Sequence, residues 1–172
     1  MSTSDLEALV RELVDGSGEL TDVVRELADA VCELADKEAI RDLARLYAHH
    51  VWHKNTDAVA ELFATDGELD TSLEDPIRGR PALKEAFDRL VGGDDKDFQP
   101  FVHNHVIELE GDRATGVCYI DLRSIDDGES MIGSGYYEDV YTRTAEGWRI
   151  QKRGLTLRFL VPLREGWAQS GE

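Results

Sequence analysis

Apolar residues recur at helical spacing through the first part of the chain. In residues 6–14, and again in residues 20–34, leucine and valine return every three or four positions, as in amphipathic helices. Gly16-Ser17-Gly18 separates the two stretches and predicts a break between two helices. Neither helix carries residues that suggest chemistry. We therefore expect residues 1–35 to form an N-terminal helical arm, for oligomerisation or as a lid, and favour oligomerisation.

The helical pattern continues into a third segment, residues 36–54, which carries the first candidate chemistry. Tyr47 and His50 fall on its apolar face, whereas His49 and His53 turn to roughly the opposite side. Two shorter helices are predicted at residues 57–63, where Phe63 looks inward, and after Pro81. A short strand over residues 68–72 lies between them.

The pattern changes to β after residue 99. Branched and aromatic residues on both sides of Gly111-Asp112 predict a hairpin over residues 101–123. Long strands follow at residues 130–142 and 148–161. His103 and His105 are two residues apart and point the same way on the first strand, with Asn104 on the other face. Helices followed by a strand meander, without an internal repeat, predict an α+β domain with helices on one face of a curved antiparallel sheet.

Composition narrows the class of partner. The 172 residues suffice for one domain with a core. The net charge of −17 repels phosphate backbones and anionic membranes, so we expect neither nucleic-acid nor membrane binding, and no apolar run could span a bilayer. Cys32 and Cys118 lie far apart, without metal or redox spacing, and read as free thiols in a reducing cytoplasm. No phosphate-binding glycine loop or serine-nucleophile elbow occurs.

Four phrases resemble the nuclear transport factor 2-like superfamily, in its SnoaL-like branch with scytalone dehydratase and bile acid 7α-dehydratase. They are residues 37–47, residues 57–67, residues 104–116, and residues 135–141 with 147–150. The resemblance implies a cone-shaped domain over residues 36–165, with a deep apolar pocket wrapped by helices and a tail over residues 166–172. Members act as dehydratases, isomerases, cyclases, hydrolases or binders.

The resemblance also implies positions for catalytic groups. The helix tyrosine of the dehydratases is present as Tyr47. Their other groups fall on residues that lack the expected chemistry here, although a suitable residue often lies nearby. The expected aspartate falls on Trp52, the histidine on Pro100 near His103, the return-strand acid on Leu122 beside Asp121, and the last-strand arginine near Leu157 beside Arg158.

The candidate catalytic residues each have a structural alternative. Tyr47 could polarise a substrate oxygen or be a core tyrosine. His50, His103 and His105 could each act as a general base, or be histidines bonded to the backbone. Asp121 would form an acid–base dyad with one of the strand histidines if its face turned inward; otherwise it faces outward.

Pocket and metal chemistry complete the expectations. The candidate substrate-binding residues are Trp52, Phe63, Asn104, Leu122, Tyr136 and Leu157. His49 with His53, and His103 with His105, have ligand-like spacing but no accompanying acid or thiol, so we expect no metal and no cofactor.

The first functional hypothesis is a cofactor-independent lyase or isomerase. It would act by acid–base chemistry on a hydrophobic cyclic metabolite such as a steroid, polyketide or aromatic compound. The second is a non-catalytic pocket for such a ligand. The third is an assembly subunit whose arm is the working surface, and in every case we expect a homo-oligomer, either dimer or trimer.

Overall fold

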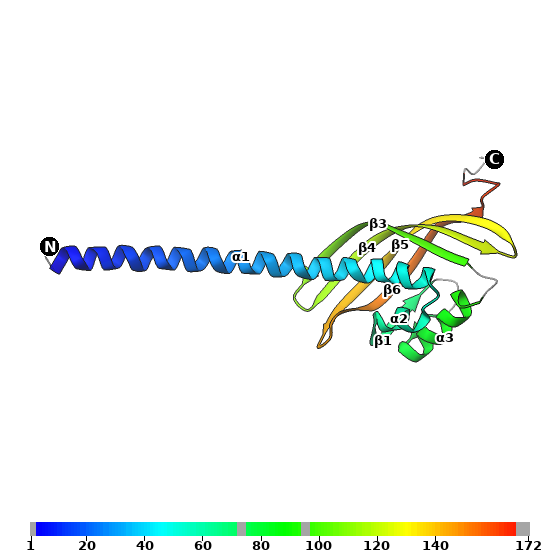
Figure 1. The fold of residues 1–172 in the computed structure, drawn as a ribbon, viewed down its shortest axis with the longest axis horizontal. Helices are drawn as coiled ribbons and strands as arrows, with labels where there is room; N and C mark the ends of the chain where they lie inside the picture. The colour runs from blue at the N-terminus through cyan, green and yellow to red at the C-terminus, as the bar shows by residue number, and fades with distance from the viewer. Residues whose placement is uncertain (1–2, 72–74, 94–96, 168–172) are drawn as a thin grey trace. The chain divides into compact units, whose positions relative to one another are not determined.

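A single long helix opens the chain. The structure, a computed structural model, describes residues 3–71, 75–93 and 97–167, with side chains described from residue 16 onward. Helix α1 runs from Thr3 to Trp52 (Figure 1). The chain divides into two compact units, Met1–Asp36 and Lys37–Glu172, and α1 contributes to both.

The predicted helix break at Gly16-Ser17-Gly18 is wrong, because α1 passes through it without interruption. A glycine in a helix interior costs only about 1 kcal/mol relative to alanine, which long helical stretches on both sides can tolerate. The predicted third helix is the last part of α1. It ends at Trp52, two residues before Lys54 takes up a left-handed φ of 54°.

In the part of the chain that the structure describes, two short helices follow α1. Helix α2 (Thr56–Glu61) is capped by Asn55, whose side-chain oxygen accepts the backbone N–H of Ala58 at 3.3 Å. Helix α3 (Arg80–Val91) starts after Gly79, whose φ of 82° suits glycine, and carries Pro81 in its first turn.

Within the described residues, six strands form one sheet in the order β2-β1-β6-β5-β4-β3. Figure 1 shows the curvature of its long strands β3 to β6. Strands β3 (Asp97–Glu110), β4 (Arg113–Asp126), β5 (Glu129–Thr144) and β6 (Gly147–Pro162) form the predicted antiparallel meander. Strand β1 (Phe63–Asp70) pairs antiparallel with β2 (Ile77–Arg78) but parallel with β6. The α+β fold class is confirmed, and the sheet is mixed rather than wholly antiparallel.

A bulge interrupts the pairing of β3 with β4. Val102 pairs with Ile120 and His105 pairs with Cys118, so His103 and Asn104 together lie opposite Tyr119. The extra residue reverses the inside–outside alternation along β3. Pro100, an even-numbered residue, is buried before the bulge, whereas the odd-numbered Ile107 is buried after it.

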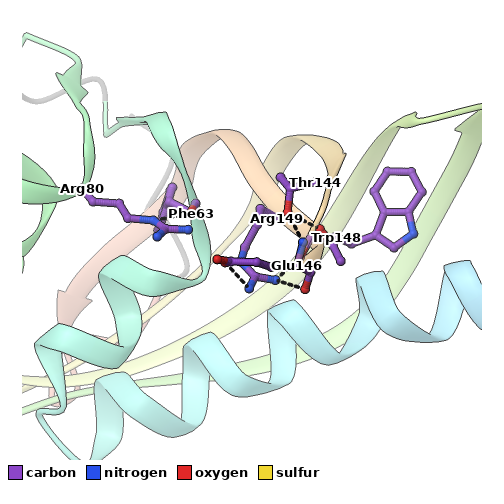
Figure 2. Close-up of polar contacts among 7 residues, drawn as sticks. Phe63, Arg80, Thr144, Glu146, Trp148 and Arg149 are labelled. Carbon is purple, nitrogen blue, oxygen red and sulfur yellow. Dashed lines mark hydrogen bonds and ion pairs between the residues drawn. The ribbon is translucent and has the colours of Figure 1, made fainter.

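Polar contacts fix the loops that close the domain (Figure 2). At the β5–β6 turn the Thr144 hydroxyl donates to the Gly147 carbonyl at 2.9 Å, and Arg149 donates to the Glu146 carbonyl at 3.3 Å. Elsewhere Arg80 Nε donates to the carbonyl of Phe63 at 2.8 Å and ties the start of α3 to β1. Each of these bonds places a side-chain donor on a backbone carbonyl.

The core lies between the helices and the inner face of the sheet. One stripe of α1 enters it through Ile40, Leu43, Tyr47 and Val51, and α3 adds Leu83 and Phe87. Further members of the cluster come from α2, from β1 and from the four long strands. The pocket described next opens within this layer.

Candidate functional site

An apolar pocket of about 320 Å³ opens between the helices and the sheet. Its volume is at the lower end of the range for small-molecule sites, enough for a compound of one or two rings. Most lining side chains are aliphatic or aromatic hydrocarbons, and the polar ones are Tyr47, Tyr137 and Thr71. The lining consists of Tyr47, Val51, Leu69, Thr71, Phe87, Leu90, Val91, Phe98, Tyr137, Leu155, Leu157 and Leu160.

The two pocket tyrosines form one aromatic unit. The rings of Tyr47, from α1, and Tyr137, from β5, meet edge to face with centroids 5.7 Å apart. The guanidinium of Arg153, on β6, lies over both rings, 4.3 Å from the Tyr47 centroid and 4.1 Å from that of Tyr137. A buried cation against two aromatic faces fixes the orientation of both rings.

Arg153 belongs to a buried chain of polar groups. Its Nε and Nη2 donate to the two carboxylate oxygens of Asp139 at 3.0 and 2.6 Å. The Tyr141 hydroxyl donates to Asp139 Oδ2 at 2.6 Å, and Tyr141 Oη lies 3.1 Å from His105 Nε2. Because the Tyr141 proton is directed to Asp139, His105 must donate its Nε2 proton to Tyr141. That tautomer leaves His105 Nδ1 as an acceptor, and this buried nitrogen has no hydrogen-bond partner.

Burial and nearby charges keep the groups of this buried polar chain, and the two pocket phenols, in defined charge states. Burial opposes the charge on Arg153, but Asp139 outweighs it and holds the pKa of the guanidinium well above its usual value. Burial lowers the pKa of His105 to about 4, with Asp139 partly opposing the shift, so this imidazole is neutral near pH 7. Burial also raises the pKa of both Tyr47 and Tyr137, so both phenols keep their protons as hydrogen-bond donors.

Some predicted site residues lie in or next to this arrangement. Tyr47 and Leu157 line the pocket. His105 stands at the far end of the buried chain, behind Tyr141 and Asp139. The sequence thus located two lining residues and one member of the polar chain.

His103 and Asp121 form a pair outside this pocket. His103 Nε2 lies 3.1 Å from Asp121 Oδ2, and both side chains are about half exposed. His103 and His105 also share a smaller hollow of about 220 Å³, whose other lining residues are Arg41, Ala44, Arg45, Val102 and Cys118. The dyad considered for an inward-facing Asp121 therefore forms with Asp121 facing outward.

Six other predicted residues do not line the pocket. His50 was expected on the buried face but is half-buried. Burial is the largest cause that lowers its pKa, and the nearby His49 and His53 lower it further. Trp52 is 40% exposed and donates its indole N–H to the Pro100 carbonyl at 2.8 Å. The remaining four are Phe63 and Leu122, both fully buried in the interior, Asn104, exposed at the bulge, and Tyr136, half-buried near Tyr119.

Sequence reasoning missed the residues that organise the polar chain. Arg153 and Asp139 are ordinary strand charges in the sequence, and a buried ion pair between β5 and β6 leaves no local signal. Tyr137 and Tyr141 lie on the same strand as Asp139. Their spacing of four on one strand, on the same face as Asp139 between them, was the available clue.

The described part of the chain shows neither a cluster of metal ligands nor a membrane-spanning helix. No three histidine, cysteine or acidic side chains gather there into a group that could hold a metal ion. None of the helices described combines the length and apolar character required for a membrane crossing.

Comparison with known proteins shows what the chain resembles. The profile of the SnoaL-like domain matches residues 32–154. An uncharacterised protein of Mycobacterium tuberculosis is 26% identical over 125 residues, 69% of this chain and 82% of its own length. The structure of a Novosphingobium aromaticivorans protein described as an aromatic ring hydroxylase has a TM-score of 0.69 at 25% identity, covering 77% of this chain and 96% of its own.

A scytalone dehydratase-like structure, also from Novosphingobium aromaticivorans, has a TM-score of 0.69 at 19% identity, over 76% of this chain and 89% of its own. This likeness shows the fold alone, and the fold is the cone that the family resemblance implied. Since the SnoaL-like profile covers most of the chain, the protein belongs to the SnoaL-like domain family of the nuclear transport factor 2-like superfamily.

Proposed function

We propose that the protein binds a largely apolar, ring-containing small molecule, with one ligand oxygen against the phenols of Tyr47 and Tyr137. The observation that carries this proposal is the lining of the 320 Å³ pocket, which combines hydrocarbon walls with two protonated phenols. Binding sites of this kind use a few placed polar groups to orient an otherwise apolar ligand. The free thiols of Cys32 and Cys118 support a reducing, cytoplasmic location.

Two-ring probes test the pocket. 2-Naphthol carries one hydroxyl, and naphthalene has the same rings without it. We expect both to bind. Binding of 2-naphthol is measured by its fluorescence, and binding of naphthalene by its competition with 2-naphthol. The double variant Tyr47→Phe with Tyr137→Phe should weaken naphthol binding about tenfold, because the lost hydrogen bonds contribute roughly 1.4 kcal/mol to binding. Its affinity for naphthalene should be unchanged.

A matched pair of variants controls for where the probe binds. Leu157→Trp places a larger side chain in the pocket wall and should weaken both probes at least about tenfold, because added core volume displaces ligand. Leu46→Trp makes the same change at an exposed position of α1 and should leave binding unchanged. Equal affinity in the Leu157 and Leu46 variants, or no binding by the wild type, would refute the proposal.

A cofactor-independent lyase or isomerase reaction in the same pocket is the second candidate. It is favoured by the two phenols, which could stabilise an oxyanion formed from a bound cyclic ketone. The described lining holds no histidine or carboxylate that could act as base, so binding is the better supported of the two. The catalytic roles of His50, His103, His105 and Asp121 remain hypotheses.

Hydrogen exchange separates catalysis from binding. In heavy water 2-tetralone exchanges its α-hydrogens for deuterium through an enolate. Proton NMR follows this exchange directly. Catalysis predicts faster exchange with protein, reduced in the double phenylalanine variant. A rate equal to that in buffer, with naphthol binding intact, supports the binder and removes the enzymatic candidate for this class of ketone.

A further inference from the structure

A seven-residue repeat runs through the arm, contrary to the expectation of no internal repeat. Residues 9–15, 16–22, 23–29 and 30–36 each carry glutamate at the fourth position, leucine at the fifth and aspartate at the seventh. The spacing of apolar residues alone does not reveal this repeat, because in one copy Gly16-Ser17-Gly18 takes the place of larger side chains. Since α1 is continuous through those residues, all four copies lie on one helix.

The repeat has the form of a coiled-coil heptad. Leucine occupies every core position of the d type and valine all but one of the a type. The d residues are Leu6, Leu13, Leu20, Leu27 and Leu34, and the a residues are Val10, Ser17, Val24 and Val31. A strict seven-residue period drifts around a lone straight helix. It stays on one side only when the helix supercoils around another.

The described part of this seam is bare. Leu20, Leu27 and Leu34 are 64–65% exposed, and Val24 and Val31 are 57% and 55% exposed. Five large apolar side chains in one row form a patch that soluble helices normally cover. The outer face of the helix is acidic, with glutamate at each c position and aspartate at each f position of the four repeats.

We infer that the seam pairs with the same seam of a second copy, in a parallel, in-register, two-stranded coiled coil over residues 6–34. Valine at a with leucine at d favours two strands. A parallel pair puts both copies of Ser17 in one polar layer. An antiparallel pair would set each serine against a leucine and disturb two layers.

The acidic outer face argues against the other obvious occupant, a membrane surface. Amphipathic helices that bind anionic lipid carry lysine and arginine on the polar face, the opposite of this arm. Most of the arm also precedes the family match, which starts at residue 32, so the seam is an addition to the SnoaL-like domain. The inference is independent of what the pocket binds.

The first test measures mass by sedimentation equilibrium. The wild type should weigh twice the 19.3 kDa chain. Leu27→Glu puts a charge in the seam and should raise the dissociation constant at least about a hundredfold. Cys32→Glu adds the same side chain at an exposed b position, outside the seam, and should not. A monomeric or trimeric wild type, or a Leu27→Glu variant that dimerises as tightly as the control, overturns the inference.

The second test fixes orientation without disturbing the fold. Val31→Cys in a Cys32→Ser background places one thiol at an a position near the end of the seam. A parallel in-register pair brings the two thiols together, and mild oxidation should give a disulfide-linked dimer on a non-reducing gel. In an antiparallel pair residue 31 faces the other end of the arm, so absence of the linked dimer would refute the parallel arrangement.

Discussion

Replacing Asp139 with asparagine should destabilise the domain strongly while changing its shape little. The carboxylate accepts hydrogen bonds from Nε and Nη2 of the fully buried Arg153 and from the hydroxyl of Tyr141. An asparagine side chain at this position would keep one acceptor oxygen but present an amide N–H₂ to one of these donors. The Asp139→Asn variant therefore leaves a buried guanidinium without a counter-charge.

The expected loss follows from that unpaired cation. Removing one partner of a buried ion pair costs about 3–5 kcal/mol, and the retained oxygen of asparagine places the variant near 3 kcal/mol. For a chain of this size each kcal/mol corresponds to about 2–4 °C in melting temperature, so a fall of roughly 6–12 °C is expected.

Urea unfolding followed by circular dichroism measures this loss against two further variants. Asp112→Asn breaks the ion pair with Arg143, in which the Asp112 side chain is 81% exposed, and should change stability little. Asp139→Asn with Arg153→Met removes both charges and should be more stable than Asp139→Asn alone, because no buried charge is left unpaired. An Asp139→Asn variant as stable as the Asp112 variant would refute this reasoning.

Three further outcomes follow from the structure. Burial depresses the pKa of His105 from 6.5 to about 4, so unfolding should take up a proton between these two pH values. Stability should therefore fall as the pH falls through this range. The fall should be smaller in His105→Gln, as measured by melting temperature against pH. Gly16→Ala should raise the helical signal at 222 nm and stabilise α1 by about 1 kcal/mol, since beyond the adjacent residues and the backbone of the helix itself nothing lies within 4 Å of the added methyl group. Gly135→Ala should destabilise by about 1–3 kcal/mol in urea unfolding, because its methyl group would lie 2.2 Å from the carbonyl oxygen of Thr156; a neutral result would contradict the close approach of β5 and β6.

Most of the fold could be predicted because its signals are local. The hairpin turn at Gly111-Asp112, the strand alternation after residue 97 and Pro81 at the start of α3 each depend on neighbouring residues. The parallel pairing of β1 with β6 joins segments about 85 residues apart and has no local signature. The break predicted at Gly16 is wrong because the cost of one glycine is small beside the long helical stretches on either side.

The site was harder to predict because it depends on contacts between strands. Tyr47 and Leu157 were found through a helix face and a family position. Arg153 and Asp139 required knowing which residues of β5 and β6 lie side by side. The inside–outside assignment of His103 and Asn104 required the bulge, which a period of two cannot reveal.

The bulge of β3 also bears on how this strand can diverge during evolution. One half of β3 contributes Phe98 to the pocket wall, and the other half contributes His105 to the buried polar chain, with opposite parity. Insertion or deletion of one residue at His103-Asn104 would shift one half relative to the other. Alignments of relatives that place a gap here would therefore exchange inward and outward positions for half of a strand. Homologous catalytic positions on β3 should be assigned from structural superposition rather than from sequence alone.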